Sequence, residues 1–535
     1  WQWDVVRRTG YIGLEAPQAL DDSGRPIQGT IVVQFQPSEP YRFQKLAHWP
    51  IHPPPGNPEF QHRPYPAADL KDPDATLTVR ESNDAPHTLI PRSRWRFARE
   101  ENGAVIPDDS HVWFADGFQP GLIYEVSYRT RICPVAGTGL LAVRDQVSFL
   151  RYAKEGNPSA GRISRALGFG ASQCGRFLRE FVYQGLNLDE QGRRVFDGIF
   201  VHVAGARRGE FNHRYAQPSV QHQPGFGHLP PFADDEQTDP LTGETDGLLR
   251  RQRELGGVPR LFHVNTSSEY WRSDCSLIHT DPAGTRDLEP PEESRIYLLA
   301  GTQHGPGGPA LSRETPSGAR VANPLNTVNQ LPLMRALLIA LEEWVADGKE
   351  PPPSRFPRLA DETAVPRPDV LEAFARIPGA SLLATDLLPT LRRVDVGPNA
   401  AEGIGQFPAT LGEPYPSSVS AVDPDRNEVA GIRMPGLQVP LGSHTGWNPR
   451  DPATGGAGQL LDMQGSTLLL PRTQSEREAT GDPRRSIAER YASREDYLAR
   501  IRAASERLVA DRYLVEEDVE LIARLAGERY DAFTG

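Results

Sequence analysis

A serine in a tight turn is the first residue of this chain whose setting suggests chemistry. Ser172 stands in Gly170-Ala-Ser-Gln-Cys-Gly175, after the apolar run 166–169 and before apolar residues at helical spacing. A serine on a sharp strand-to-helix turn has a strained backbone and requires small residues two positions before and after it. Gly170 meets this requirement, and Cys174 is a small residue in place of the usual glycine. We expect the Cys174 side chain to point towards the strand as a spacer. The pattern predicts a nucleophilic serine.

A serine nucleophile needs a histidine base, and the base needs a carboxylate that orients it. In a parallel sheet, such partners lie on loops just after the carboxyl ends of strands. His304 follows an apolar run and lies in a glycine-rich loop, and Glu269 follows the preceding apolar run. We therefore predict His304 as the base and Glu269 as the acid. Asp274 and Asp281 lie on the same connection as Glu269 and are its alternatives.

The other histidines are weaker candidates for the base. His202 and His263 lie within predicted strands, and we interpret them as packed core or wall residues. The remaining candidates lie in loops, namely His213, His222, His228 and His444.

Buried strands alternate with helices through the middle of the chain. The runs 196–203, 261–265 and 295–300 are almost continuously apolar, as is typical of strands covered on both faces of a parallel sheet. Apolar residues recur at helical spacing over 140–150 and 331–345. The sequence therefore predicts an α/β protein with a mostly parallel sheet flanked by helices.

The flanking regions differ from this core in composition. Residues 1–105 contain short β-branched or aromatic runs at 30–35, 76–79 and 95–97, separated by proline-rich segments such as 51–56. We expect a β-rich N-terminal region there.

Four regions result from these patterns. Residues 1–105 form the β-rich region, and residues 106–360 form the α/β core. The segment 205–258 inside the core is too long for a simple connection and is interpreted as a lid-like insertion. Residues 361–470 form an irregular, cap-like segment, and residues 471–535 form C-terminal helices.

In its motifs and their order, the chain resembles the α/β-hydrolase superfamily, and more narrowly its large bacterial branch of "alpha/beta hydrolase domain-containing" proteins. The order serine, acid, histidine is the order found in that superfamily. The resemblance implies an α/β-hydrolase fold and an esterase-like serine hydrolase with Ser172, Glu269 and His304 as its catalytic triad. The motifs that carry the resemblance are Gly170-Ala-Ser-Gln-Cys-Gly-Arg176, Val195-Phe-Asp-Gly198, Ser267-Ser-Glu-Tyr-Trp271 and Gly301-Thr-Gln-His-Gly305.

The resemblance also implies an oxyanion hole. Its first donor is the backbone N–H of Gln173, the residue after the nucleophile. No His-Gly-Gly-Gly run supplies a second donor, and we assign that role to the loop that contains Val135 and Ala136. The side chains considered for substrate contact are Tyr270, Trp271, Trp447 and Arg176, and ordinary packing or ion pairing accounts for them equally well.

Composition limits the partners of the chain. The net charge is −12, and the arginines form no basic run, which argues against nucleic acid. No apolar run approaches the ~20 residues that cross a bilayer. The cysteines Cys133, Cys174 and Cys275 lack zinc-site spacing, and we expect neither a metal nor a cofactor. The absence of a methionine at Trp1 slightly favours an exported protein. Oligomeric state and redox compartment stay open.

The sequence therefore favours hydrolysis of a carboxylic ester, either a small molecule or a polymer-linked one. Acyl transfer or amide hydrolysis by the same triad is one alternative. A glycan-linked esterase that uses the β-rich region is a second. A catalytically silent binding or scaffold protein of the same fold is a third.

Overall fold

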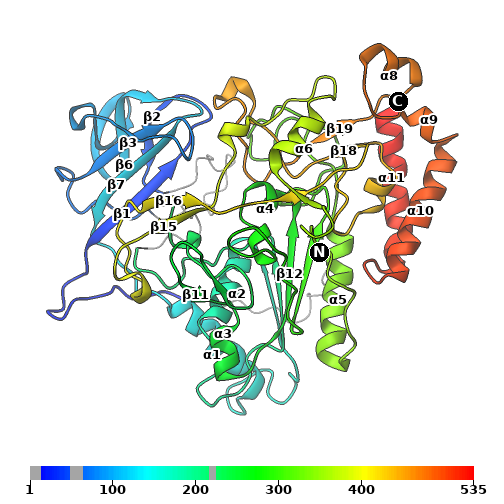
Figure 1. The fold of residues 1–535 in the computed structure, drawn as a ribbon. Coiled ribbons are helices and arrows are strands. Elements are labelled where there is room, and N and C mark those ends of the chain that lie inside the picture. The colour runs from blue at the N-terminus through cyan, green and yellow to red at the C-terminus, as the bar shows by residue number, and fades with distance from the viewer. Residues whose placement is uncertain (1–13, 48–63, 216–223, 535) are drawn as a thin grey trace.

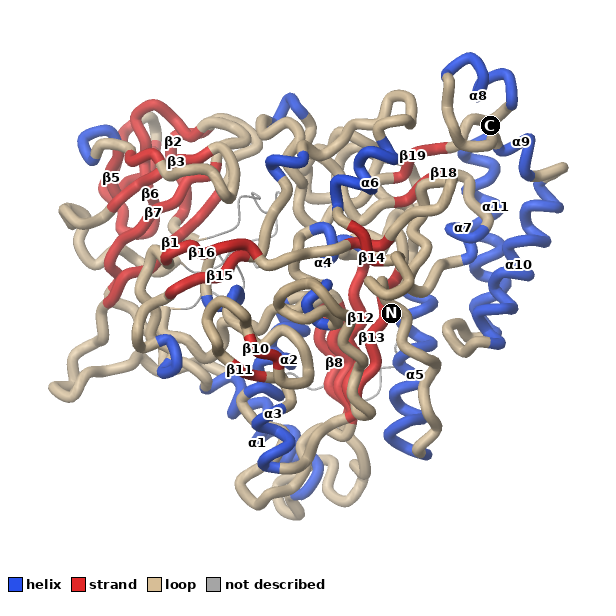
Figure 2. Tube along the Cα trace, viewed as in Figure 1, coloured by secondary structure: helices blue, strands red, loops and turns tan. Residues whose placement is uncertain are grey.

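The computed structural model describes residues 14–47, 64–215 and 224–534. A β-rich N-terminal region, a parallel sheet with helices and a helical C-terminal region follow one another across the molecule (Figure 1), and Figure 2 shows how much of the chain between them is loop. The proline-rich segment 51–56 and His222 lie outside the described residues.

The N-terminal region consists of two antiparallel sheets with one apolar core. The first has the order β1 (Gly29–Phe35), β7 (Ile123–Thr130), β3 (Thr76–Arg80) and β4 (Thr88–Leu89). The second has the order β2 (Tyr41–Lys45), β6 (Ala104–Phe118) and β5 (Trp95–Glu101). The predicted boundary at residue 105 is therefore too early, because β6 and β7 complete these sheets.

A parallel sheet forms the centre of the molecule. Its strands lie in chain order: β8 (Leu167–Ala171), β9 (Gly198–His202), β12 (Arg260–Thr266) and β13 (Ser294–Leu299). Ala171 pairs with His202, and His202 pairs with Val264, so the carboxyl ends of these strands lie at one edge. We call this edge the carboxyl edge.

Both faces of the sheet are buried. Ile199 and Val201 of β9 pack with α1 (Thr138–Tyr152) and α2 (Gln173–Tyr183), whereas Phe200 between them packs with α5 (Leu331–Asp347). Successive side chains of a strand point to opposite faces, and this is why the strands read as continuous apolar runs.

The insertion 205–258 contains short elements and returns to the sheet. Its elements are β10 (Gln237–Thr238), β11 (Thr245–Asp246) and α3 (Arg250–Leu255).

The segment 361–470 is mostly loop and packs over β13 and α4 (Ser267–Trp271) through an aromatic and aliphatic cluster. Its elements are β14 (Ala364–Val365), α6 (Arg367–Phe374), β15 (Arg392–Asp395), β16 (Thr410–Pro414), β17 (Val419–Ser420), α7 (Pro435–Gln438), β18 (Gly442–His444) and β19 (Thr467–Leu469).

The C-terminal helices form an outer layer beside α5 (Figure 1). They are α8 (Gln474–Thr480), α9 (Ile487–Arg490), α10 (Arg494–Ala510) and α11 (Val519–Thr534). Within the described ranges, no helix is both long and apolar enough to span a bilayer.

Candidate active site

Ser172 lies in the turn between β8 and α2 and has a strained backbone. Its φ of 56° and ψ of −115° lie outside the regions that residues with a side chain usually adopt. The turn is close to neighbouring backbone. A Cβ on Gly170 would collide with the carbonyl group of Cys174, and one on Gly175 would lie 2.8 Å from the carbonyl oxygen of His202. The two glycines therefore permit the turn that exposes the serine.

The structure corrects the predicted orientation of Cys174. Its side chain is exposed rather than directed towards the strand. The close approach that requires a glycine falls at Gly175, one residue later. A cysteine is therefore accommodated at position 174 because its side chain points to solvent.

Glu269 lies in the first turn of α4, where Thr266 caps the helix. Its Oε2 accepts hydrogen bonds from the backbone N–H and the hydroxyl of Thr266, at 2.9 and 2.5 Å. Its Oε1 lies 2.6 Å from Nδ1 of His304. The side chain is 1% exposed. Burial opposes its charge, but the interactions with His304 and Thr266 lower the pKa of Glu269 to about 2. Glu269 is therefore a carboxylate at neutral pH.

His304 lies in the loop after β13 and is held on one side by Glu269. Its backbone N–H donates to the carbonyl of Met463 at 3.3 Å. The side chain remains 12% exposed. In the neutral ring, Nδ1–H donates to Glu269, which leaves Nε2 as the nitrogen that can accept a proton. The pair has the geometry of a base with its orienting acid.

Neighbouring strands bring Ser172 to the same edge as this pair. The Ser172 N–H donates to the carbonyl of His202 at 2.8 Å, and the charges of Glu269 and His304 both act on the His202 ring. Both Ser172 and His304 are described, and no hydrogen bond joins the serine hydroxyl to the histidine ring. Catalytic hydrogen bonds are often long without substrate and shorten in the substrate complex.

His202 is a buried residue beside the pair, as the sequence suggested. Its Nδ1 lies 3.0 Å from the carbonyl of Val264, so the neutral ring donates there. Burial lowers the pKa of His202 to about 4. His202 is therefore neutral at physiological pH and adds no positive charge next to His304.

The two alternative acids have other partners. The Asp274 carboxylate pairs with Arg207 and Arg272, and Asp281 accepts hydrogen bonds from Thr285 and from the Arg286 backbone. Neither makes the contact with His304 that Glu269 makes.

The proposed oxyanion donors differ in their present use. Gln173 is the first residue of α2, so its backbone N–H lies at the N-terminal end of the helix. The Val135 N–H donates to the carbonyl of Pro17 at 2.9 Å, and the Gly137 N–H donates to that of Phe211 at 3.0 Å. The prediction of a second donor in this loop therefore rests on Ala136.

Three of the predicted substrate contacts lie in the core. Tyr270 and Trp271 are 2% exposed, and Trp447 is fully buried. Trp271 and Trp447 pack together with ring centroids 5.4 Å apart, and the Tyr270 hydroxyl contacts His279. These side chains pack the helix that carries Glu269 into the core, and their contact with a substrate stays a prediction. Arg176 lies one turn into α2 and is 8% exposed.

Glu428 is a site residue that the sequence did not indicate. It is buried, accepts a hydrogen bond from the Gly301 N–H at 2.7 Å and contacts the Ser267 hydroxyl. Ser267 begins the Glu269 helix, and Gly301 begins the His304 loop. Burial raises the pKa of Glu428 to about 7. A carboxyl group from the cap-like segment thus ties the two loops together.

A family model described as "Alpha/beta hydrolase domain" matches residues 126–524, which is most of the chain. The chain belongs to the alpha/beta hydrolase domain family. No curated protein and no solved structure matches it. The matched range includes the parallel sheet, α4 and the loops of Ser172, Glu269 and His304. The family resemblance expected from the sequence is confirmed, and membership indicates a hydrolase of this superfamily.

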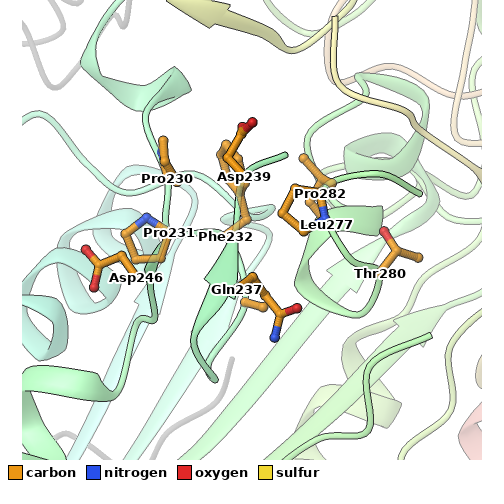
Figure 3. Close-up of a pocket in the computed structure, with 10 residues that line it drawn as sticks. Pro230, Pro231, Phe232, Gln237, Asp239, Asp246, Leu277, Thr280 and Pro282 are labelled. Carbon is orange, nitrogen blue, oxygen red and sulfur yellow. The ribbon is translucent and has the colours of Figure 1, made fainter. Parts of the chain in front are cut away.

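Neither of two pockets of this alpha/beta hydrolase domain is lined by a residue of the candidate triad. One is lined by residues of the insertion and of the segment after α4, including Phe232, Asp239 and Thr280 (Figure 3). The other lies at the amino end of β8, beside Leu167 and Val345. Within the described residues, no cluster of three or more histidine, cysteine or acidic side chains could hold a metal ion.

Proposed function

We propose that the chain hydrolyses carboxylic esters, with Ser172 as nucleophile, His304 as base and Glu269 as the acid. The observation that carries the proposal is the 2.6 Å contact between His304 Nδ1 and Glu269, at the edge where the strained serine turn lies. Family membership supports a hydrolase, and the serine turn favours a reaction that passes through an acyl-enzyme.

In the proposed mechanism, Nε2 of His304 takes the hydroxyl proton of Ser172 as the oxygen attacks the ester carbonyl. The protonated His304 then gives this proton to the departing alcohol, and an acyl-serine forms. Water attacks the acyl-serine and gives a proton to His304, which passes it to the Ser172 oxygen as the carboxylic acid is released. The low pKa of Glu269 keeps a negative charge beside the imidazolium throughout. The neutral ring of His202 adds no repulsion to it.

The oxyanion that forms during each attack requires donors that are in place beforehand. The Gln173 N–H lies at the N-terminus of α2, where the helix dipole also favours negative charge. Ala136 is the proposed second donor.

The test compares Ser172→Ala with Ser164→Ala, a change at an exposed serine before β8. On chromogenic esters of increasing acyl length, we expect Ser172→Ala to lower kcat by about 10⁴-fold or more, and Ser164→Ala to leave it unchanged. A fluorophosphonate probe should label the wild type and the control but not Ser172→Ala. Undiminished turnover by Ser172→Ala would remove the serine from the mechanism. Amide substrates and added alcohol acceptors distinguish ester hydrolysis from amide hydrolysis and acyl transfer.

A further inference from the structure

Three buried arginines meet at the carboxyl edge. Arg176 follows β8, Arg207 follows β9, and Arg272 follows β12, so each comes from the loop or helix after a different strand. Their exposed fractions are 8%, 2% and 9%. Asp274 pairs with two of them, at 3.2 Å from Nε of Arg207 and 3.5 Å from Nη2 of Arg272. We call these four residues the arginine cluster.

Arg176 differs from the other two arginines because it forms no ion pair with a carboxylate of the described residues. Within the described part of the chain, no carboxylate forms an ion pair with it and no acceptor takes its hydrogen bonds, and its Nε is buried without a partner. Burial, and then the charges of Arg272 and Arg207, lower the pKa of Arg176 to about 10. Arg176 is thus a cation at neutral pH. Leaving a buried charge uncompensated is costly, so a protein rarely does so without a functional reason.

The carboxylates around Arg176 are already engaged or distant. Asp274 holds the two flanking arginines, and Asp274 and Glu210 act on Arg176 only through longer-range attraction. Asp462 is exposed and acts on Arg207 and Arg272. Among the residues that the structure describes, no anion contacts Arg176, whereas Arg207 and Arg272 contact Asp274.

The position of Arg176 on α2 relates it to the nucleophile. It lies four residues after Ser172, and residues at this spacing are neighbours on one face of a helix. A long side chain in a helix leans towards the N-terminus and covers the preceding turn. We therefore expect the Arg176 side chain to lean towards the turn that carries Ser172.

We propose that Arg176, supported by Arg207 and Arg272, binds a carboxylate on the substrate, so that the preferred substrates are esters that also carry a free carboxylate. This inference rests on the proposed ester hydrolysis. A guanidinium group presents paired N–H donors that match the two oxygens of a carboxylate. A bound carboxylate supplies the missing anion and fixes the ester group relative to Ser172.

The experiment measures kcat/KM for two esters that differ only at the far end of the acyl chain. Monoethyl adipate carries a carboxylate there, and ethyl hexanoate carries a methyl group. We expect the wild type to prefer the adipate half-ester by about 10- to 100-fold, the range that charge-assisted hydrogen bonds provide. Half-esters of shorter and longer diacids then report the distance between Arg176 and Ser172.

Arg176→Met should reduce this preference to within a few-fold, and Arg176→Lys should retain part of it. The matched control is Arg194→Gln, which removes one positive charge from an exposed arginine before β9. It should leave the preference at the wild-type value. We also expect Arg176→Met to raise the thermal midpoint, because it removes an unpaired buried charge. A purely structural role for Arg176 would lower it.

A wild type without preference for the half-ester, or a preference that persists in Arg176→Met, would overturn this inference. In either case, hydrolysis of ethyl hexanoate that depends on Ser172 would leave the proposed function standing. Turnover of both esters by Ser172→Ala would instead contradict the proposed function. Binding of monoethyl adipate to Ser172→Ala, measured by calorimetry, gives a readout without turnover, and the added Arg176→Met change should abolish it.

Discussion

In the described part of the parallel-sheet region, two histidine–carboxylate pairs differ in what faces the second ring nitrogen. In the edge pair, Nδ1 of His304 contacts Glu269 at 2.6 Å, and the histidine is 12% exposed. In the buried pair, Nε2 of His263 contacts Asp234 at 2.9 Å, and the histidine is fully buried. The other nitrogen of His263 lies 3.2 Å from the Arg179 guanidinium group.

This difference favours His304 over His263 as the base. A general base needs one nitrogen that a substrate or nucleophile can reach, and only the edge pair offers it. The same helix, α2, contributes an arginine to each region. Arg179 donates to the carbonyls of Ala206 and Phe232 at 2.8 and 2.6 Å, whereas Arg176 has no such acceptor within the described residues. Within the described residues, Nε of both arginines is buried without a hydrogen-bond partner, so the two differ in the carbonyl acceptors that only Arg179 has.

Replacing each histidine is expected to have the largest effects, on activity for His304 and on stability for His263. We expect His304→Ala to lower kcat by about 10⁴-fold or more. Its loss of stability should be smaller than that of His263→Ala, because Thr266 still donates two hydrogen bonds to Glu269. His263→Ala should leave Asp234 and Arg179 without their shared partner and destabilise the fold by about 3–5 kcal/mol, while the folded fraction keeps its kcat. Titration of the active fraction with a fluorophosphonate, together with thermal unfolding, separates the two effects. An inactive but stable His263→Ala protein would contradict the assignment.

Replacing each acid is expected to have the next largest effect. Glu269→Gln should lower kcat by about 10³-fold, because the amide cannot stabilise the imidazolium of His304. Asp234→Asn should act on stability instead.

The pKa of Glu269 is lowered from 4.5 to about 2, so its ionisation stabilises the fold above pH 4.5, and this contribution is lost as the pH falls towards 2. Thermal midpoints of Glu269→Gln and the wild type should therefore converge below about pH 3.

Glu428 extends the comparison, because it connects the two loops of the edge pair through the Gly301 backbone N–H and the Ser267 hydroxyl. Glu428→Ala should lower kcat by about 10-fold or more, since Ser267 and Gly301 lose their shared acceptor. Glu428→Gln keeps an acceptor for the Gly301 N–H and should retain most activity. Rescue by the glutamine variant identifies a positioning role, and equal loss in both variants would contradict it.

The same residue gives a pH test of opposite sign to that of Glu269. Burial raises the pKa of Glu428 from 4.5 to about 7, so the folded protein holds a proton that the unfolded chain releases. Stability therefore falls as the pH rises from about 4.5 to 7, by a few kcal/mol at about 1.4 kcal/mol per unit of pKa shift. Glu428→Gln removes this dependence. Its thermal midpoint should match the wild type near pH 5 and exceed it at pH 8.

The features that the sequence predicted are local ones. The apolar runs of β9, β12 and β13 lie within a residue or two of the expected ranges, because strands buried on both faces leave a continuous signal. The turn at Ser172 could also be predicted, since Gly170 and Gly175 lie close to the serine in the chain. Glu269 and His304 could be paired because parallel strands end at the same edge.

The features that the sequence did not predict depend on contacts between distant segments. Glu428 comes from a loop-rich segment without periodicity, and nothing near it in the chain signals its bonds to Ser267 and Gly301. The proline and polar residues at 107–110 are atypical of a strand, so the full length of β6 was not predicted. Aromatic type alone does not distinguish a pocket wall from a core residue, and Trp447 proved to be core.

The smallest expected effect concerns the turn itself. Cys174→Gly restores the usual pattern, but the Cys174 side chain is exposed and makes no close approach that glycine would relieve. We therefore expect kcat/KM to change by less than about 3-fold, since exposed substitutions rarely alter stability by more than about 0.5 kcal/mol. Gly175→Ala is the matched contrast, because its Cβ would lie 2.8 Å from the carbonyl oxygen of His202, next to the backbone that Ser172 binds. That variant should lose most of its activity. Equal activities of the two variants would show that the strained turn does not depend on this close approach.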